Sequence, residues 1–195
     1  MGTSAIYREA PYQEKLPRKV SLETFLRKYR EGAPGVKYEF NNGVIEKSDA
    51  MKLTEHYIIL NLQDVYKNTK AFAERALLTS EVEVWTSDTQ FRKPDLAFVT
   101  LEQTRAAFDG FEPVPEFVIE VVSKNDNFNQ LGNKIDEYFL AGVEIVWVIA
   151  PHLNQVQIHR KSSENIQRCT GDQICSAEPI VEGFKMKAAD IFKRP

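Results

Sequence analysis

Apolar and polar residues follow different periods along this chain, and the period separates predicted helices from predicted strands. Helical spacing predicts helices over residues 22–30 and 52–69, a short helix after Thr100, and a helix that is capped by Asp126 and runs to Leu140. Extended runs predict a hairpin over residues 36–47, a strand near Val84, strands over 96–99, 117–122 and 143–150, and an edge hairpin after Pro151. This order predicts one mixed α/β domain over residues 20–195, with a central mixed sheet flanked by helices. We expect residues 1–19 to form a partly disordered lead-in.

The composition is that of an ordinary globular domain. The chain has 195 residues, of which 43% are hydrophobic and 27% charged, so it can bury a core without disulfides or metal. No apolar run approaches the roughly 18 residues of a membrane-spanning helix, so we expect no membrane partner. Cys169 and Cys175 have no CxxC partner, which argues against a disulfide framework or a cysteine-based zinc site. A reducing, cytoplasmic setting is the expectation.

Charge is distributed unevenly along the chain. Lys and Arg number 25 against 28 Asp and Glu, a net charge of −3, which argues against nucleic-acid binding by bulk positive charge. Residues 1–37 carry 8 basic and 4 acidic side chains, residues 38–145 carry 10 and 19, and residues 146–195 carry 7 and 5. A central acidic surplus is most often a solvated face. The alternative is that some of these carboxylates converge on a divalent metal ion.

Glu120 is the most informative residue because it lies within the apolar run 117–122. A carboxylate buried there must be protonated, paired or bound to a cation. Asp95 follows Pro94 and opens the apolar strand 96–99. It is either a strand-start residue that accepts local backbone N–H groups, or a partner of Glu120. Two acids on adjacent strands of one sheet can share a divalent ion.

A cation is available on the helix that follows Glu120. Lys134 and Tyr138 are four residues apart and therefore share a helix face, so Lys134 can reach across the end of the sheet toward Glu120. The alternative is an ordinary solvated lysine. Beside metal-bound carboxylates, a lysine would stabilise charge on a phosphate or orient the attacking water.

Two further residues carry open alternatives. Glu39 lies on the first hairpin strand, as an exposed residue or as a further metal or water ligand. His56 opens the second helix, as a capping or packing residue or as a phosphate contact. No glycine-rich phosphate loop, GxSxG elbow or HExxH motif occurs, which weakens the hypothesis of a small-ligand α/β protein.

Five segments in one order resemble a known family: YEFNNGVIE, Ser48 with His56, RKPDLAFV, PEFVIEVVSKND and NKIDEYFLAGVEIVWVI. This order, spanning residues 20–160, is similar to the restriction-endonuclease-like family called Uma-two, a bacterial branch of the PD-(D/E)XK nuclease superfamily. The resemblance implies a restriction-endonuclease-like core, Mg²⁺-dependent phosphodiester cleavage, and an acidic pair at Asp95 and Glu120. It also allows a homodimer that pairs two active sites.

One position departs from the superfamily pattern. The lysine expected two residues after the second acid is replaced by Val122, and the resemblance moves that role to Lys134.

The leading hypothesis is therefore an endonuclease acting on nucleic acid, with DNA the expected substrate. Asp95 and Glu120 would hold Mg²⁺ or Mn²⁺, with Lys134 and Glu39 completing the catalytic set. We place His56, Tyr138 and Ser123 around it as phosphate contacts or supporting residues. The competing hypothesis is a nuclease-derived binding or regulatory protein that cleaves little.

Overall fold

The computed structural model describes residues 16, 19–49, 51–124, 126 and 128–195, so nearly all of the predicted lead-in lies outside the described residues. The helices and strands follow one another in this order: α1 (Leu22–Lys28), β1 (Val36–Asn41), β2 (Val44–Asp49), α2 (Leu53–Tyr66), α3 (Lys70–Ala73), β3 (Leu77–Thr79), β4 (Val84–Ser87), β5 (Gln90–Arg92), β6 (Leu96–Val99), α4 (Leu101–Phe108), β7 (Phe117–Val121), α5 (Phe128–Ala141), β8 (Ile145–Ala150), η1 (Pro151–Leu153), β9 (Gln155–Arg160), β10 (Ser163–Thr170), β11 (Ile174–Ser176), β12 (Lys185–Lys187) and α6 (Ala188–Ile191). Each helix in this part of the chain is too short or too polar to cross a membrane.

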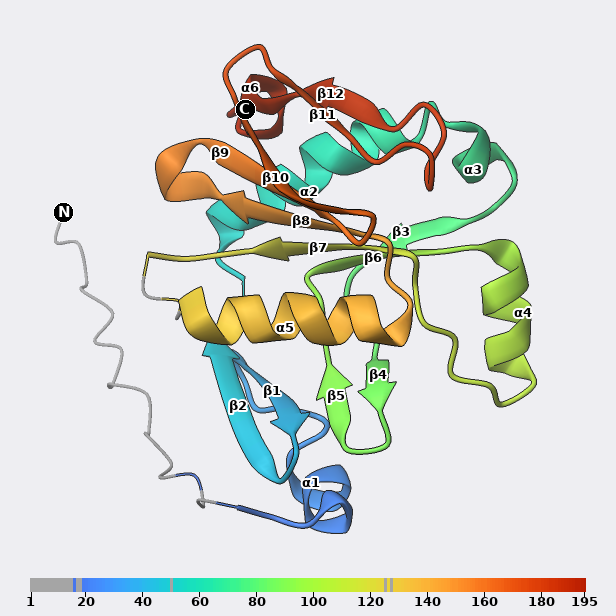
Figure 1. Ribbon diagram of the computed structural model, residues 1–195, viewed down its shortest axis with the longest axis vertical. Helices are drawn as coiled ribbons and strands as arrows, with labels where there is room; N and C mark the ends of the chain where they lie inside the picture. Colours follow the sequence, from blue (N-terminus) through green and yellow to red (C-terminus); the bar gives the residue numbers. More distant parts are fainter. Residues whose placement is uncertain (1–15, 17–18, 50, 125, 127) are drawn as a thin grey trace, which may run out of the picture.

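The central sheet has six strands in the order β10-β9-β8-β7-β6-β3 (Figure 1). Only β7 and β8 run parallel, whereas the other neighbouring pairs of this sheet are antiparallel. The crossover between the parallel strands is α5, as such a connection requires. All six residues of β8 are buried, because the sheet is covered on both faces. The predicted mixed sheet with flanking helices is confirmed.

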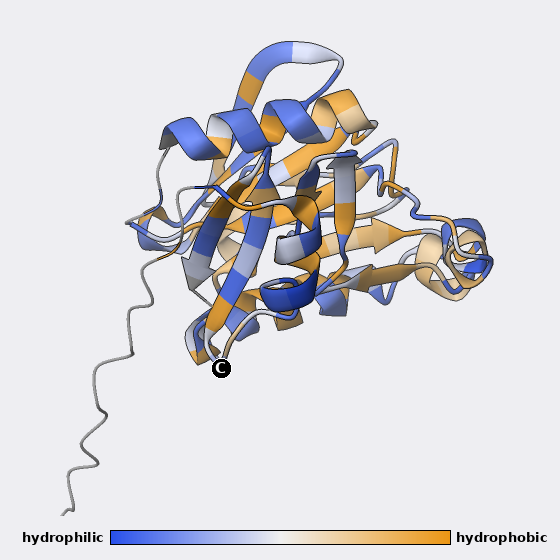
Figure 2. Cartoon of the chain, turned by 90° about the horizontal axis from the view of Figure 1, so that it is seen from below, coloured by the Kyte–Doolittle hydropathy of each residue, from blue (hydrophilic) through white to orange (hydrophobic). Residues whose placement is uncertain are grey.

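Two layers cover this sheet. On one face, α5 packs Ile135 and Tyr138 against Val118, Val146 and Val148 of the central strands. On the other face lie α2 and the C-terminal segment made of β11, β12 and α6 (Figure 1). Figure 2 shows mainly hydrophobic residues along the central strands and more hydrophilic ones along α5, the long helix at the top of that view.

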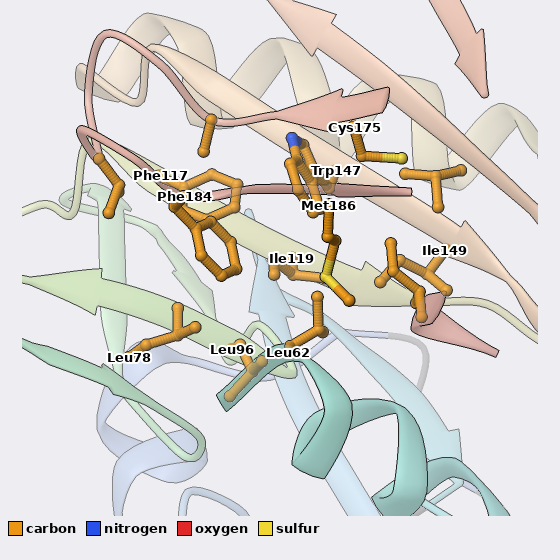
Figure 3. Close-up of a cluster of buried hydrophobic side chains, with 14 of the residues drawn as sticks. Leu62, Leu78, Leu96, Phe117, Ile119, Trp147, Ile149, Cys175, Phe184 and Met186 are labelled. Atoms are coloured by element: carbon orange, nitrogen blue, oxygen red, sulfur yellow. The ribbon is translucent and has the colours of Figure 1, made fainter. Parts of the chain in front are cut away.

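The larger core lies between the sheet, α2 and the C-terminal segment. Trp147 of β8 stacks on Phe184, with ring centroids 5.5 Å apart and an angle of 18° between the rings. Phe117 meets the Trp147 ring edge-on at 5.3 Å. Figure 3 shows these rings above Leu62 of α2 and Leu96 of β6. The C-terminal segment therefore completes the core instead of extending from it.

The predicted first hairpin is confirmed, but it belongs to a second sheet in the order β2-β1-β5-β4. One face of this sheet is apolar and holds α1, whose Phe25 stacks on Phe40 and meets Phe91 edge-on. Strand alternation turns Lys37 and Glu39 to the opposite face, toward α5 and the end of the central sheet. This polar face is what brings β1 into the candidate site.

The apolar spacing that predicts α2 includes Tyr57 and Leu60, but they are 38% and 43% exposed. The buried side of α2 is formed instead by Ile58, Ile59 and Leu62. Hydrophobic periodicity fits both stripes, and the one that meets the sheet is buried.

The expected cap at Asp126 stays a prediction, because residue 127 lies outside the described residues and α5 is described from Phe128. The Asp126 carboxylate accepts the backbone N–H of Ser123 at 2.5 Å, so it stabilises the turn between β7 and α5. The two cysteines, Cys169 and Cys175, are free and buried.

Candidate active site

Asp95 and Glu120 lie at the same end of neighbouring strands. β6 pairs with β7 in an antiparallel register that joins Leu96 to Ile119 and Ala97 to Val118. Continuing this register by one residue places Asp95 opposite Glu120. Cross-strand partners project to the same face of a sheet, so both carboxylates face α5. The prediction of two acids on adjacent strands is confirmed.

The Asp95 carboxylate is held by one backbone group and one lysine. Its Oδ2 accepts the backbone N–H of Val121 at 2.7 Å, and its Oδ1 lies 2.9 Å from Lys37 Nζ. Lys37 also donates to the carbonyl of Lys93 at 2.7 Å. Burial lowers the pKa of Lys37, but the negative charges of Asp95, Glu120 and Glu39 together raise it above its ordinary value. The backbone N–H that Asp95 accepts belongs to β7, 26 residues away, so Asp95 joins β6 to the strand that carries Glu120 and is no merely local strand-start residue.

Glu120 is buried, with 6% of its surface exposed, and is compensated by two groups from α5. Lys134 Nζ lies 2.9 Å from Glu120 Oε1, and the Tyr138 hydroxyl donates to the same oxygen at 2.7 Å. Burial raises the pKa of Glu120; Lys134 opposes that rise and the negative charge of Asp95 adds to it. Burial and the Glu120 charge also raise the pKa of Tyr138 well above its ordinary value. Lys134 is thus a buried partner of Glu120 and no solvated lysine.

Glu39 completes the cluster from β1, and both of its carboxylate oxygens accept hydrogen bonds. Oε1 accepts from Lys134 Nζ at 2.8 Å and from the Lys93 backbone N–H at 2.8 Å. Oε2 accepts from Arg92 at 3.2 Å. Burial alone would raise the pKa of Glu39, but the charges of Lys134, Lys37 and Arg92 lower it to about 2. Glu39 is therefore a charged, fully engaged side chain that holds Lys134.

Arg92 lies behind this cluster and binds three carboxylates while only 1% exposed. Its guanidinium contacts Glu39, Glu46 at 2.5 Å and Glu137 at 2.6 Å. Asn41 joins the last two by donating to Glu46 at 3.0 Å and to Glu137 at 3.3 Å. Burial would lower the pKa of Arg92, but the carboxylates of Glu39 and Glu46 raise it further above its usual value. This network ties β1, β2, β5 and α5 together.

The charged groups at this end of the sheet have an excess of negative charge. The Lys37–Asp95 pair lies beside a network of Arg92 and Lys134 with four glutamates, Glu39, Glu46, Glu120 and Glu137, which makes five carboxylates and three cations. The net charge is −2, which one divalent cation would neutralise. Within the described residues, no group of three or more His, Cys, Asp or Glu side chains is placed to hold a metal ion. Two carboxylates still fit Mg²⁺, which keeps several waters and takes its remaining ligands from substrate phosphate.

The other two predicted residues lie at the edge of the cluster. His56 is exposed on α2 and lines a pocket of about 350 Å³ whose walls include Lys37 and Asp95. Ser123 lies just beyond the end of β7, and its backbone N–H donates to Asp126.

Lys37 and Arg92 were missed at the level of sequence. Lys37 alternates with Glu39 on one strand, and Arg92 precedes Asp95 by three residues, so each has a weak local signal. Neither spacing shows which acid the cation meets, because the ion pairs join residues that are 58 and 53 apart in sequence.

The comparisons with known proteins agree with this geometry. None of the curated proteins matches the sequence. A solved structure from Anabaena variabilis ATCC 29413, described as a "putative nuclease belonging to DUF820", superposes with a TM-score of 0.73 at 16% identity, covering 89% of this chain and 97% of that one. That likeness shows a shared fold. The model of the Uma2 family, described as "Putative restriction endonuclease", matches residues 22–189, and this chain therefore belongs to the Uma2 family.

Proposed function

We propose that this protein is a metal-dependent endonuclease that hydrolyses phosphodiester bonds of DNA. The family description and the nuclease-like fold support the general class. The observation that carries the proposal is the convergence of Asp95, Glu120 and Lys134, from two strands and a helix, on one end of the central sheet. A net-negative buried cluster is what a divalent cation and a phosphate oxygen together require.

Each residue has a distinct role in this proposal. Asp95 and Glu120 hold Mg²⁺ or Mn²⁺, which supplies an activated water and neutralises charge at phosphorus. Lys134 positions that water or stabilises the developing negative charge. Glu39 orients Lys134 through the 2.8 Å contact, because its oxygens are already engaged by donors. Tyr138 orients the Glu120 carboxylate by its hydrogen bond.

The test is cleavage of plasmid and linear DNA by the full chain with Mg²⁺ or Mn²⁺, compared with Asp95→Ala, Glu120→Ala and Lys134→Ala variants. We expect each variant to lose at least about 100-fold in rate, as the removal of one electrostatic catalytic group commonly does. Lys67→Ala is the control, because Lys67 makes an exposed ion pair with Asp64 on α2. Full activity of Glu120→Ala would refute the assignment.

A second candidate is a nucleic-acid-binding protein of nuclease descent that does not cleave. The observation in its favour is that both acids already have lysine partners, Lys37 on Asp95 and Lys134 on Glu120. Isothermal titration with Mg²⁺ or Mn²⁺ separates the two functions. Metal binding that disappears in Asp95→Ala supports the nuclease, whereas no metal binding together with retained DNA binding supports the binding protein.

A further inference from the structure

Two lysines reach the acid pair, and they differ in what surrounds them. Lys134 lies between Glu39 and Glu120, at 2.8 and 2.9 Å, and its ammonium is 5.8 Å from the centre of the Tyr138 ring. Lys37 contacts one carboxylate oxygen, Asp95 Oδ1, and one backbone carbonyl. Lys134 is therefore enclosed within the cluster, whereas Lys37 lies at its margin.

That margin opens into the pocket of about 350 Å³ between α2 and the loop that precedes β1. Lys37 and Asp95 both line this pocket, together with apolar Met51 and Ile59. Its lining includes neither Glu120 nor Lys134. Lys37 is thus a partly buried cation that contacts Asp95 at the wall of a space where a ligand can enter.

Lys37 lies on the Asp95 oxygen that has no backbone partner. Oδ2 accepts the Val121 N–H, whereas Lys37 Nζ lies 2.9 Å from Oδ1, so a metal ion that binds Oδ1 meets Lys37 there. A divalent cation at Oδ1 would repel the nearby ammonium strongly, because like charges in a partly buried site are poorly screened. The cation and Lys37 therefore compete for one oxygen.

We propose that a divalent cation displaces Lys37 from Asp95, and that the freed ammonium turns into the pocket and binds the phosphate backbone of the substrate. This rests on the proposed function and adds a second catalytic lysine to it. A lysine suits the task because it is a compact charge on a flexible four-carbon chain, able to keep its bond to the Lys93 carbonyl or to leave it. Displacement also ties phosphate binding to metal loading.

The test is isothermal titration of Mg²⁺ and Mn²⁺ into the chelator-treated full-length protein and its Lys37→Met variant. Removing the competing ammonium should tighten metal binding by about tenfold or more. With metal at saturation, the same variant should cleave DNA at least about 100-fold more slowly, because the phosphate loses its lysine. Metal affinity that is unchanged or weaker in Lys37→Met overturns the displacement.

The matched control is Lys93→Met. Lys93 is also buried and lines the same pocket, but its ammonium binds the Arg30 carbonyl and Glu83 instead of the acid pair. Its metal affinity should equal that of the wild type, and an equal tightening in this variant would overturn the proposal as non-specific. Should Lys37→Met fail to fold, Lys37→Gln serves in its place, because the neutral amide can still donate to the Lys93 carbonyl.

The two proposals fail in distinguishable ways. Wild-type protein that cleaves DNA, with unaltered metal affinity in the Lys37 variants, overturns the displacement and leaves the nuclease function intact. Tighter metal binding in the variants without any cleavage by the wild type supports the displacement and counts against the nuclease function. Absence of metal binding in all variants overturns both.

Discussion

Lys134 Nζ lies 2.9 Å from Glu120 Oε1, although the two residues are 14 positions apart and belong to different elements. The superfamily pattern would place this lysine on the strand itself, at the position of Val122. Val122 follows the end of β7, and the same alternation that points Glu120 toward α5 turns Val122 to that side, where it packs on the α5 core. A lysine on α5 reaches the same carboxylate from above the sheet. The ammonium beside Glu120 is thus supplied by α5 instead of by position 122 at the end of β7.

This relationship predicts a rescue. Lys134→Ala should lose cleavage, and the double variant Lys134→Ala with Val122→Lys should recover part of it, because residue 122 shares a face with Glu120. Single-turnover cleavage rates of the two variants measure the recovery. Val122 packs against a buried cluster, so its replacement should cost about 1–2 kcal/mol of stability, which thermal unfolding reports. A double variant no faster than Lys134→Ala would show that the strand position cannot serve.

Replacement of Arg92 should cause a large loss of stability. Replacing it by Met leaves the carboxylates of Glu39, Glu46 and Glu137 without their shared cation, two of them largely buried. Removing one partner of a buried ion pair typically costs about 3–5 kcal/mol. Urea unfolding should show a loss of this size.

Arg105→Ala on α4 is the control, because the Arg105 side chain makes no ion pair among the described residues. This variant should change the unfolding free energy by less than about 0.5 kcal/mol. Arg92→Lys should lie between, because an ammonium cannot reproduce the planar fork. A loss below about 1 kcal/mol in Arg92→Met would contradict the role given to this network.

The burial of His159 predicts that the unfolding free energy depends on pH between pH 5 and 8. Its Nε2 is buried without a hydrogen-bond partner among the described residues, and burial lowers the pKa of His159 below 6.5. The unfolded chain therefore takes up a proton at a higher pH than the folded one, so the stability from this residue is complete above about pH 6.5 and declines as the pH falls through the folded pKa. Unfolding free energy measured between pH 5 and 8 should fall on the acid side, and His159→Leu should flatten that slope.

The exposed histidines of the chain serve as controls for this prediction. The sequence has two further histidines, His56 and His152, and both are exposed. Variants in which each is replaced by Gln are the controls and should keep the wild-type slope. A His159→Leu protein with an unaltered slope between pH 5 and 6.5 would assign the dependence to another group.

Local pattern was sufficient for the longer helices, for the central strands and for the two candidate acids. A carboxylate inside an apolar strand, as at Glu120, is expensive to bury unless it is compensated, and this cost makes Glu120 a candidate site residue from the sequence alone. Asp95 was identified in the same way, by its place where an apolar strand begins. Lys134 was predictable because helical spacing restricts the face it can occupy.

The sequence by itself determined the longer helices, the central strands and the two candidate acids, because these depend on burial and on neighbours a few residues apart. The short elements α3, β3, β5, β11, β12 and α6 were not predicted. Only the tertiary structure decided which cation meets which acid. Lys37 and Asp95 are 58 residues apart, and Arg92 and Glu39 are 53 apart, so the packing of the second sheet against α5 selects these partners. Many lysines and arginines could pair with a given carboxylate by charge alone. The free energy of a buried ion pair depends on distances and desolvation that exist only once the layers are assembled.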